Sequence, residues 1–192
     1  MLRVGVLGGT FDPPHAAHLA LARAALDAGA VDVVYVVPAG DPWQKSTEAS
    51  AMDRLAMTRL AFADVDGCEV RDLEVNRPGP TYAIDTVRSL RDAGVIVRYL
   101  VGSDALASLP TWHRVDALAQ LADFLTVARP GVAVETPPIP GLQVTVLPSR
   151  ERPEASRDIR AHIHATGNRP DGLDDDVWAY IVQHGLYGIR DV

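Results

Sequence analysis

The sequence has a single cysteine, no long apolar run and no excess of basic charge. Cys68 has no second cysteine with which to form an internal disulfide, and one thiol does not indicate a metal cluster. The apolar runs are far shorter than the roughly 20 residues that a membrane-spanning helix needs, so we expect no membrane segment. The net charge of −7 argues against a nucleic-acid partner, which usually needs a basic surface.

Lysine is also scarce, because only Lys45 among the 18 basic residues is a lysine. A general preference for arginine codons explains this bias, yet the single retained lysine is a weak indication of a site. The rest of the composition, with 47% apolar and 22% charged residues among 192, is typical of a soluble globular chain of about one domain. Residues 1–10 lack the apolar stretch of a signal peptide, so we expect a cytoplasmic protein. The composition leaves a homo-oligomer open.

Short apolar runs alternate with amphipathic stretches along most of the chain. The runs predict strands over 2–7, 33–37, 69–75, 95–101, 124–128 and 142–147. The amphipathic stretches predict helices over 16–28, over 49–63 and after Thr81, which could cap its helix. Strands separated by helices predict an α/β fold with a doubly wound, mainly parallel sheet. The chain changes character after residue 150, where two short helices are expected near 156–165 and 174–184.

Ligands of doubly wound sheets bind beyond the carboxyl ends of the strands. This rule selects four loops, at 8–18, at 38–45, at 102–112 and from 129 onward. The first reads Gly-Gly-Thr-Phe-Asp-Pro-Pro-His-Ala-Ala-His, which is neither a dinucleotide fingerprint nor a P-loop.

Glycines in this first loop would let backbone N–H groups approach an anion at the start of a helix. His15 and His18 are three residues apart and share one face of that helix start, where both rings could donate hydrogen bonds to phosphate oxygens. Taken alone, they could also be two exposed histidines at a helix end.

The first loop resembles the G-G-T-F-D-P-x-H-x-G-H signature of the nucleotidyltransferase superfamily, and most of all the nicotinate-mononucleotide adenylyltransferases. The resemblance continues along the chain through motifs at 38–45, at Arg54 with Met57, at 74–86, at 101–104 with Trp112, at 129–131 and at 177–187. It implies a Rossmann-like core over residues 1–150. It also implies that a C-terminal helical segment, 151–192, completes the nucleotide site.

The resemblance implies transfer of a nucleoside monophosphate from a nucleoside triphosphate to a small phosphorylated acceptor, with release of pyrophosphate. In this family the substrates are ATP and nicotinate mononucleotide, and the product is deamido-NAD. The acceptor phosphate is already ionised at pH 7, so alignment and charge neutralisation can drive the reaction without a catalytic base. Mg²⁺ would be the cofactor, held mainly by the triphosphate and not by a protein metal site.

The resemblance also assigns roles to residues of this chain. The catalytic residues that handle the phosphates would be His15, His18, Lys45 and Arg160. The residues that bind the nucleotide would be Gly8, Gly9, Thr10, Phe11, Gly102, Asp104, Arg129, Ser156 and Arg157. The residues that bind the acceptor would be Asp12, Lys45, Thr81, Tyr82, Ala83 and Trp112.

Some of these residues have a structural alternative. Asp104 could cap the helix that follows it, and Ser156 could cap the helix that begins there. Asp12 could stabilise its own turn. Trp43, in the second loop, could equally have a role in the site or be a packing residue.

Three departures from the family pattern fall on the two substrate pockets. Ala17 replaces the glycine of H-x-G-H, Ala83 replaces the threonine of S-Y-T, and Arg157 replaces a small hydroxyl residue of I-S-S-T-x-I-R. They leave a second hypothesis, a CTP-dependent cytidylyltransferase acting on a small phosphonate or phosphate such as phosphonoformate. A third hypothesis is a nucleotide-binding protein without turnover, against which the intact histidine pair argues.

Overall fold

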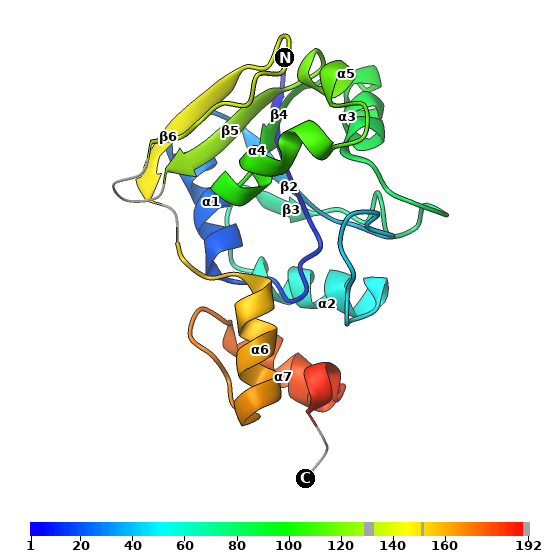
Figure 1. Ribbon diagram of the computed structural model, residues 1–192, viewed down its shortest axis with the longest axis vertical. Helices are drawn as coiled ribbons and strands as arrows, with labels where there is room; N and C mark the ends of the chain where they lie inside the picture. The colour runs from blue at the N-terminus through cyan, green and yellow to red at the C-terminus, as the bar shows by residue number, and fades with distance from the viewer. Residues whose placement is uncertain (129–132, 151, 190–192) are drawn as a thin grey trace.

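Six parallel strands form one sheet at the centre of the molecule (Figure 1). The computed structural model describes residues 1–128, 133–150 and 152–189. The strands are β1 (Arg3–Gly9), β2 (Val33–Pro38), β3 (Cys68–Val70), β4 (Ile96–Leu100), β5 (Asp123–Ala128) and β6 (Val144–Arg150). They lie in the order β3-β2-β1-β4-β5-β6. This order confirms the predicted doubly wound α/β fold.

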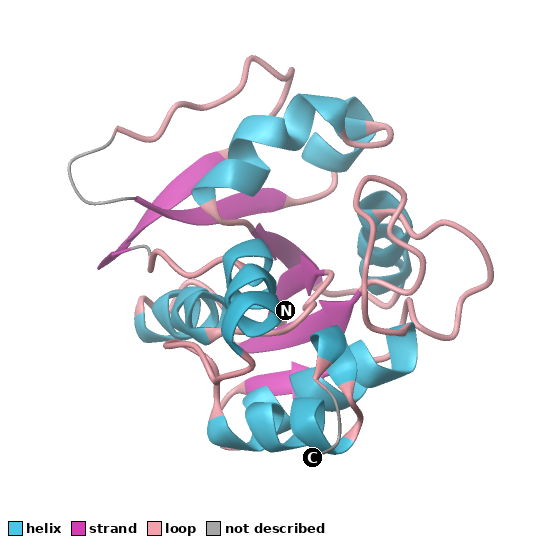
Figure 2. Cartoon of the chain, turned by 60° about the horizontal axis from the view of Figure 1, so that its bottom comes forward, coloured by secondary structure: helices cyan, strands magenta, loops and turns pink. Residues whose placement is uncertain are grey.

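Helices cover both faces of the sheet (Figure 2). They are α1 (Ala16–Asp27), α2 (Ala51–Ala61), α3 (Ala83–Asp92), α4 (Ser103–Ser108), α5 (Val115–Ala119), α6 (Ser156–Thr166) and α7 (Asp175–Gln183), with two 3₁₀ turns, η1 (Leu109–Thr111) and η2 (Leu186–Gly188). Leu21 of α1 and Met57 of α2 belong to the apolar core on one face. Ile84 of α3 and Leu118 of α5 belong to the core on the other face.

The two C-terminal helices lie together at the end of the molecule that holds α2 (Figure 1). Ile159 and Ile163 of α6, and Val177 and Ile181 of α7, are buried in the same apolar core as Leu21. The separation of the chain into parts 1–150 and 151–192 stays a prediction. In the described part of the chain, no helix is long and apolar enough to cross a membrane.

The chain order of the strands reverses between β1 and β4, which lie side by side at the centre of the sheet. Loops after two such strands leave toward opposite faces and open a crevice at the carboxyl edge, where ligands of these folds bind. The loops that follow β1, β2 and β4 therefore meet at one place. These are three of the four loops that the sequence selected.

The helix after residue 81 begins differently from the prediction. Tyr82, and not Thr81, is its N-cap residue. The hydroxyl of Thr81 instead donates a hydrogen bond of 3.2 Å to the carbonyl oxygen of Asp41. The backbone N–H of Thr81 donates to the same carbonyl oxygen. The hydroxyl is therefore used in a contact between two loops and not in a helix cap.

Two other predicted segments differ in extent. The third strand covers only Cys68–Val70, because the chain then turns and buries Glu74, whose Oε1 accepts a bond of 2.6 Å from Thr86. The segment 102–112, expected as a loop, contains α4 and η1. Elements of six and three residues are too short for a recognisable helical period.

Candidate active site

The loop between β1 and α1 is packed closely against the end of the sheet. A Cβ atom at Gly8 would lie 2.1 Å from the hydroxyl oxygen of Tyr99, so only glycine fits there. Phe11 has a φ angle of 49° and is fully buried, with its ring 4.7 Å from that of His18. Gly8 therefore leaves room for Tyr99 at the end of β1, and Phe11 supports the ring of His18.

His15 and His18 lie against each other at the start of α1. Their ring centroids are 3.8 Å apart. The backbone N–H of His15, the N-cap residue, donates a bond of 3.2 Å to Nδ1 of His18. Since Nδ1 accepts this bond, the neutral His18 ring carries its proton on Nε2 and keeps one N–H to donate.

Both histidines are neutral at pH 7. Burial lowers the pKa of His15 to about 4, an effect that the charge of Glu154 partly offsets. Burial also lowers the pKa of His18 well below its usual value of 6.5, and the charges of His15 and Lys45 act in the same direction. The pair therefore offers hydrogen-bond donors, while positive charge must come from other side chains.

Arg54 on α2 ties the first two loops together. Its guanidinium is buried and donates to the carbonyl oxygens of Thr10 at 2.7 Å, of Ala39 at 2.7 Å and of Gly40 at 2.9 Å. Its pKa is lowered by burial, which the charge of Asp12 partly offsets. The sequence motif named this arginine without a role, and the geometry makes it a support for both loops.

Asp12 lies beneath the site and not at its surface. Its side chain is 1% exposed, and its two oxygens accept bonds from the N–H groups of Glu48 and Ala49, at 2.8 and 3.2 Å, and from the hydroxyl of Tyr187 at 2.7 Å. No oxygen is left at the surface for a substrate. In this arrangement its carboxylate fastens the surrounding loops together, and its assignment to the acceptor stays a prediction.

The C-terminal helix α6 reaches the first loop through two side chains. The hydroxyl of Ser156 donates to the carbonyl oxygen of Pro13 at 2.9 Å. Arg160 donates from Nη1 to the carbonyl oxygen of Asp12 at 2.7 Å. Ser156 does not cap α6, since Ala155 is the N-cap residue. The structure thus places Arg160 at the loop that carries the histidine pair.

Arg157, the third departure from the family pattern, lies outside this arrangement. Its side chain is 84% exposed and pairs with the neighbouring Asp158 at 3.2 Å. Its assignment to the nucleotide stays a prediction.

Three residues predicted to bind the acceptor or left open in that respect, Trp43, Tyr82 and Trp112, belong to aromatic contacts. Tyr82 stacks on His113 with ring centroids 4.1 Å apart, and the exposed Trp43 meets Tyr82 edge-on at 5.8 Å. Trp112 packs edge-on against the buried Tyr99 at 5.6 Å. The sequence did not select His113, for which adjacency to Trp112 was the only available signal.

Gln44 holds the second loop against η1. Its amide donates to the carbonyl oxygen of Thr111 at 2.9 Å and to the hydroxyl of the same residue at 2.8 Å. This contact keeps the segment around Trp43 and Lys45 near the aromatic group. Lys45 is exposed, and its positive charge is among the causes that lower the pKa of His18.

The remaining predicted residues fall as follows. Ala83 is the first residue of α3, and the buried Thr81 bonds Asp41. Gly102 is the N-cap residue of α4, and Asp104 is exposed in its first turn. Arg129 lies outside the described residues.

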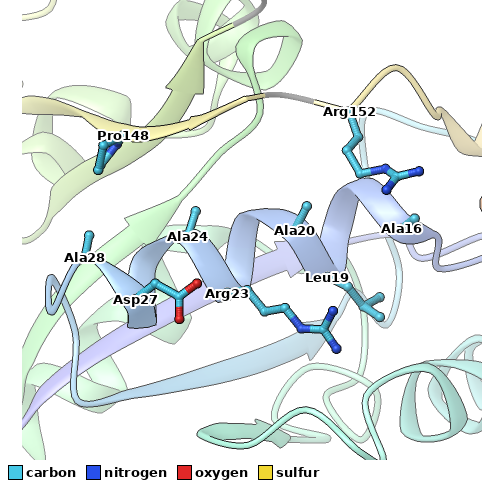
Figure 3. A pocket seen from close by; sticks show the side chains of 9 residues that line it. All are labelled: Ala16, Leu19, Ala20, Arg23, Ala24, Asp27, Ala28, Pro148 and Arg152. Atoms are coloured by element: carbon cyan, nitrogen blue, oxygen red, sulfur yellow. The ribbon is translucent and has the colours of Figure 1, made fainter.

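A groove of about 530 Å³ runs along the outer side of α1 (Figure 3). Ala16, Ala20 and Ala24 of the helix and Ala28, which follows it, line one side, with Pro148 and Arg152 opposite. A smaller cavity of about 230 Å³ lies beside His15, between α1 and residues 172–174. Within the described ranges, no three His, Cys, Asp or Glu side chains come together as a metal site.

Comparison with known proteins shows the family of this chain. A family model described as cytidylyltransferase-like matches residues 6–162. A probable nicotinate-nucleotide adenylyltransferase of Bordetella petrii is 39% identical over 196 residues, which cover 97% of this chain and 100% of that protein. One of Roseiflexus sp. (strain RS-1) is 40% identical over 194 residues, which cover 96% of this chain and 97% of that protein.

Among solved structures, the nicotinic acid mononucleotide adenylyltransferase of Plasmodium falciparum, complexed with NaAD, superposes with a TM-score of 0.79. The match covers 99% of each chain at 17% sequence identity. At this identity, the superposition shows a shared fold.

Proposed function

The chain belongs to the nicotinate-nucleotide adenylyltransferase family, and on this premise we propose that it transfers the adenylyl group of ATP to nicotinate mononucleotide and releases pyrophosphate. One observation carries the proposal: the neutral pair His15 and His18 lies in a loop that Arg160 contacts and on which the charge of Lys45 acts. The relatives extend over nearly the full chain, so the whole site falls within the similarity. We place this reaction in the cytoplasm.

The proposed chemistry needs no covalent intermediate. A phosphate oxygen of nicotinate mononucleotide attacks the α-phosphorus of ATP, the bond to the β-phosphate oxygen breaks, and pyrophosphate leaves with the electron pair. Nε2–H of His18 donates to a phosphate oxygen as its charge grows. Lys45 and Arg160 supply the positive charge that the neutral histidines lack. The product is deamido-NAD.

We propose that Mg²⁺ enters with the triphosphate and neutralises part of its charge. Three carboxylates near the first loop are already occupied, and one of them, Glu154, accepts from Arg152 at 2.6 Å. Asp12 accepts from three protein donors, and Glu48 accepts from Arg160 and contacts His164. The donor set therefore suits an ion that takes most of its ligands from phosphate oxygens.

The CTP-dependent alternative is not favoured by the relatives that match this chain over its full length. Arg157 gives that alternative little support, because its exposed side chain pairs with Asp158 and does not reshape a pocket. Ala83 remains the departure that bears most directly on the acceptor, since it follows Tyr82 of the aromatic group.

Pyrophosphate release by the purified chain tests the proposal. ATP and CTP are each combined, with Mg²⁺, with nicotinate mononucleotide, nicotinamide mononucleotide or phosphonoformate. We expect turnover with ATP and nicotinate mononucleotide, and a fall of about 10²- to 10³-fold in kcat for His18→Ala. His162→Ala, an exposed histidine on α6, is the matched control and keeps the rate. Turnover only with CTP and phosphonoformate, or nucleotide binding without release, would contradict the proposal.

A further inference from the structure

The guanidinium group of Arg160 is held on two edges. Its Nε donates to Oε1 of Glu48 at 2.7 Å, and its Nη1 donates to the carbonyl oxygen of Asp12 at 2.7 Å. The side chain is only 19% exposed. A planar guanidinium fixed at two points has little rotational freedom. Its orientation beside the first loop is therefore set before any ligand arrives.

Glu48 is itself well anchored. Its backbone N–H donates to Oδ2 of the buried Asp12 at 2.8 Å. Its second carboxylate oxygen lies 2.8 Å from Nε2 of His164, which donates to it when Glu48 is ionised. Arg160 and His164 are one turn apart on α6, so both reach the carboxylate from the same helix face. The second loop and α6 are joined at this one side chain.

We propose that Glu48 is a positioning residue, which orients Arg160 toward the β- and γ-phosphates of the bound triphosphate. The inference rests on the proposed function. A guanidinium has five N–H donors, and the contacts to Glu48 and Asp12 use two of them. The other donors can bind phosphate oxygens without a new rotamer, which reduces the ordering cost of binding.

The negative charge of Glu48 has an opposite effect, because it repels the triphosphate. Removing the side chain distinguishes the two effects, because they change KM for ATP in opposite directions. If positioning dominates, Glu48→Ala raises KM for ATP. If repulsion dominates, Glu48→Ala lowers KM for ATP. Glu48→Gln removes the charge but keeps a side-chain oxygen that can accept from Nε of Arg160.

Steady-state kinetics of the full chain test this role. We expect Glu48→Ala to raise KM for ATP by about 3- to 10-fold, the effect of losing one contact to a charged group. We expect KM for nicotinate mononucleotide to stay within about twofold, because the contacts to the acceptor do not change. Glu48→Gln should restore KM for ATP to within about twofold of the natural chain. Glu69→Ala is the matched control, since Glu69 is a half-exposed glutamate paired with Arg71 at 3.0 Å on β3.

Two results would overturn the inference: an unchanged or lower KM for ATP in Glu48→Ala, or equal shifts in the alanine and glutamine variants. Arg160→Ala separates this failure from failure of the proposed function. If the natural chain turns over and Arg160→Ala raises KM for ATP while Glu48→Ala does not, only the role of Glu48 is wrong. If the natural chain releases no pyrophosphate from ATP and nicotinate mononucleotide, the proposed function is wrong. Equal thermal unfolding midpoints exclude misfolding as the cause of a raised KM.

Discussion

The hydroxyl of Tyr187 donates a hydrogen bond of 2.7 Å to Oδ1 of Asp12, although the two residues are 175 positions apart in the chain. The bond joins η2, near the C-terminal end, to the loop that carries the histidine pair. Both residues are buried, and the burial of Tyr187 next to Asp12 raises the pKa of its hydroxyl. The C-terminal segment thus reaches beneath the site and supplies a donor to its main buried carboxylate.

Removing this hydroxyl should destabilise the protein. Tyr187→Phe leaves a buried carboxylate short of one donor, which costs about 1–2 kcal/mol of unfolding free energy. Urea unfolding followed by circular dichroism measures the change. Tyr180→Phe is the control, because the hydroxyl of Tyr180 bonds Asp53 at 3.0 Å in a partly exposed place. We expect that variant to lose less than about 0.5 kcal/mol. Equal losses in the two variants would show that the buried bond to Asp12 stabilises the fold no more than an exposed one.

Arg54 should be among the most sensitive residues of the chain. Arg54→Leu removes the donors to the carbonyl oxygens of Thr10, Ala39 and Gly40 and leaves these buried acceptors unsatisfied. The loss should be at least about 3 kcal/mol of unfolding free energy, measured by urea unfolding. Arg59→Leu is the control, because Arg59 lies on the same helix but is 57% exposed. Its guanidinium lies 3.9 Å from the carboxylate of Asp72. We expect less than about 0.5 kcal/mol from it. A loss below about 1 kcal/mol for Arg54→Leu would show that the two loops hold their positions without it.

The sheet and the histidine loop were predictable because their signals are local. An apolar run that ends at Gly8 predicts a buried strand and a turn, and two histidines three residues apart predict a shared face. The contacts of Asp12 were not predictable, since its partners Glu48, Arg160 and Tyr187 come from three distant segments. Nothing in the neighbourhood of Asp12 in the sequence indicates that its carboxylate is buried.

Two residues that could cap a helix by their type and position bond elsewhere. Ser156 has the residue type and place of a helix cap, yet its hydroxyl bonds Pro13 across the molecule. Thr81 likewise bonds Asp41 and leaves the cap position to Tyr82. In both places a long-range partner outcompetes the local one, and a capping rule that uses only neighbouring residues does not include it.

The stability of the protein should depend on the protonation of His15. Burial lowers its pKa from 6.5 in the unfolded chain to about 4 in the fold. Between these values the unfolded chain takes up a proton that the folded chain does not, so unfolding free energy falls as the pH falls. The contribution of His15 to unfolding free energy is complete above pH 6.5, the pKa in the unfolded chain. It is lost as the pH falls to the folded pKa of about 4, and the full loss from this one group is about 3 kcal/mol.

Urea unfolding at a series of pH values from 7 down to 4.5 measures this dependence, with variants that separate His15 from the acidic residues titrating in the same range. His15→Asn removes the ionisable ring, so we expect its unfolding free energy to fall less steeply with acidification than that of the natural chain. His162→Asn, at an exposed position on α6, should keep the natural slope. If His15→Asn and His162→Asn show the same slope, His15 takes up its proton as readily in the fold as in the unfolded chain. His15 would then carry positive charge near pH 6, and the low pKa assigned to it in the fold would be wrong.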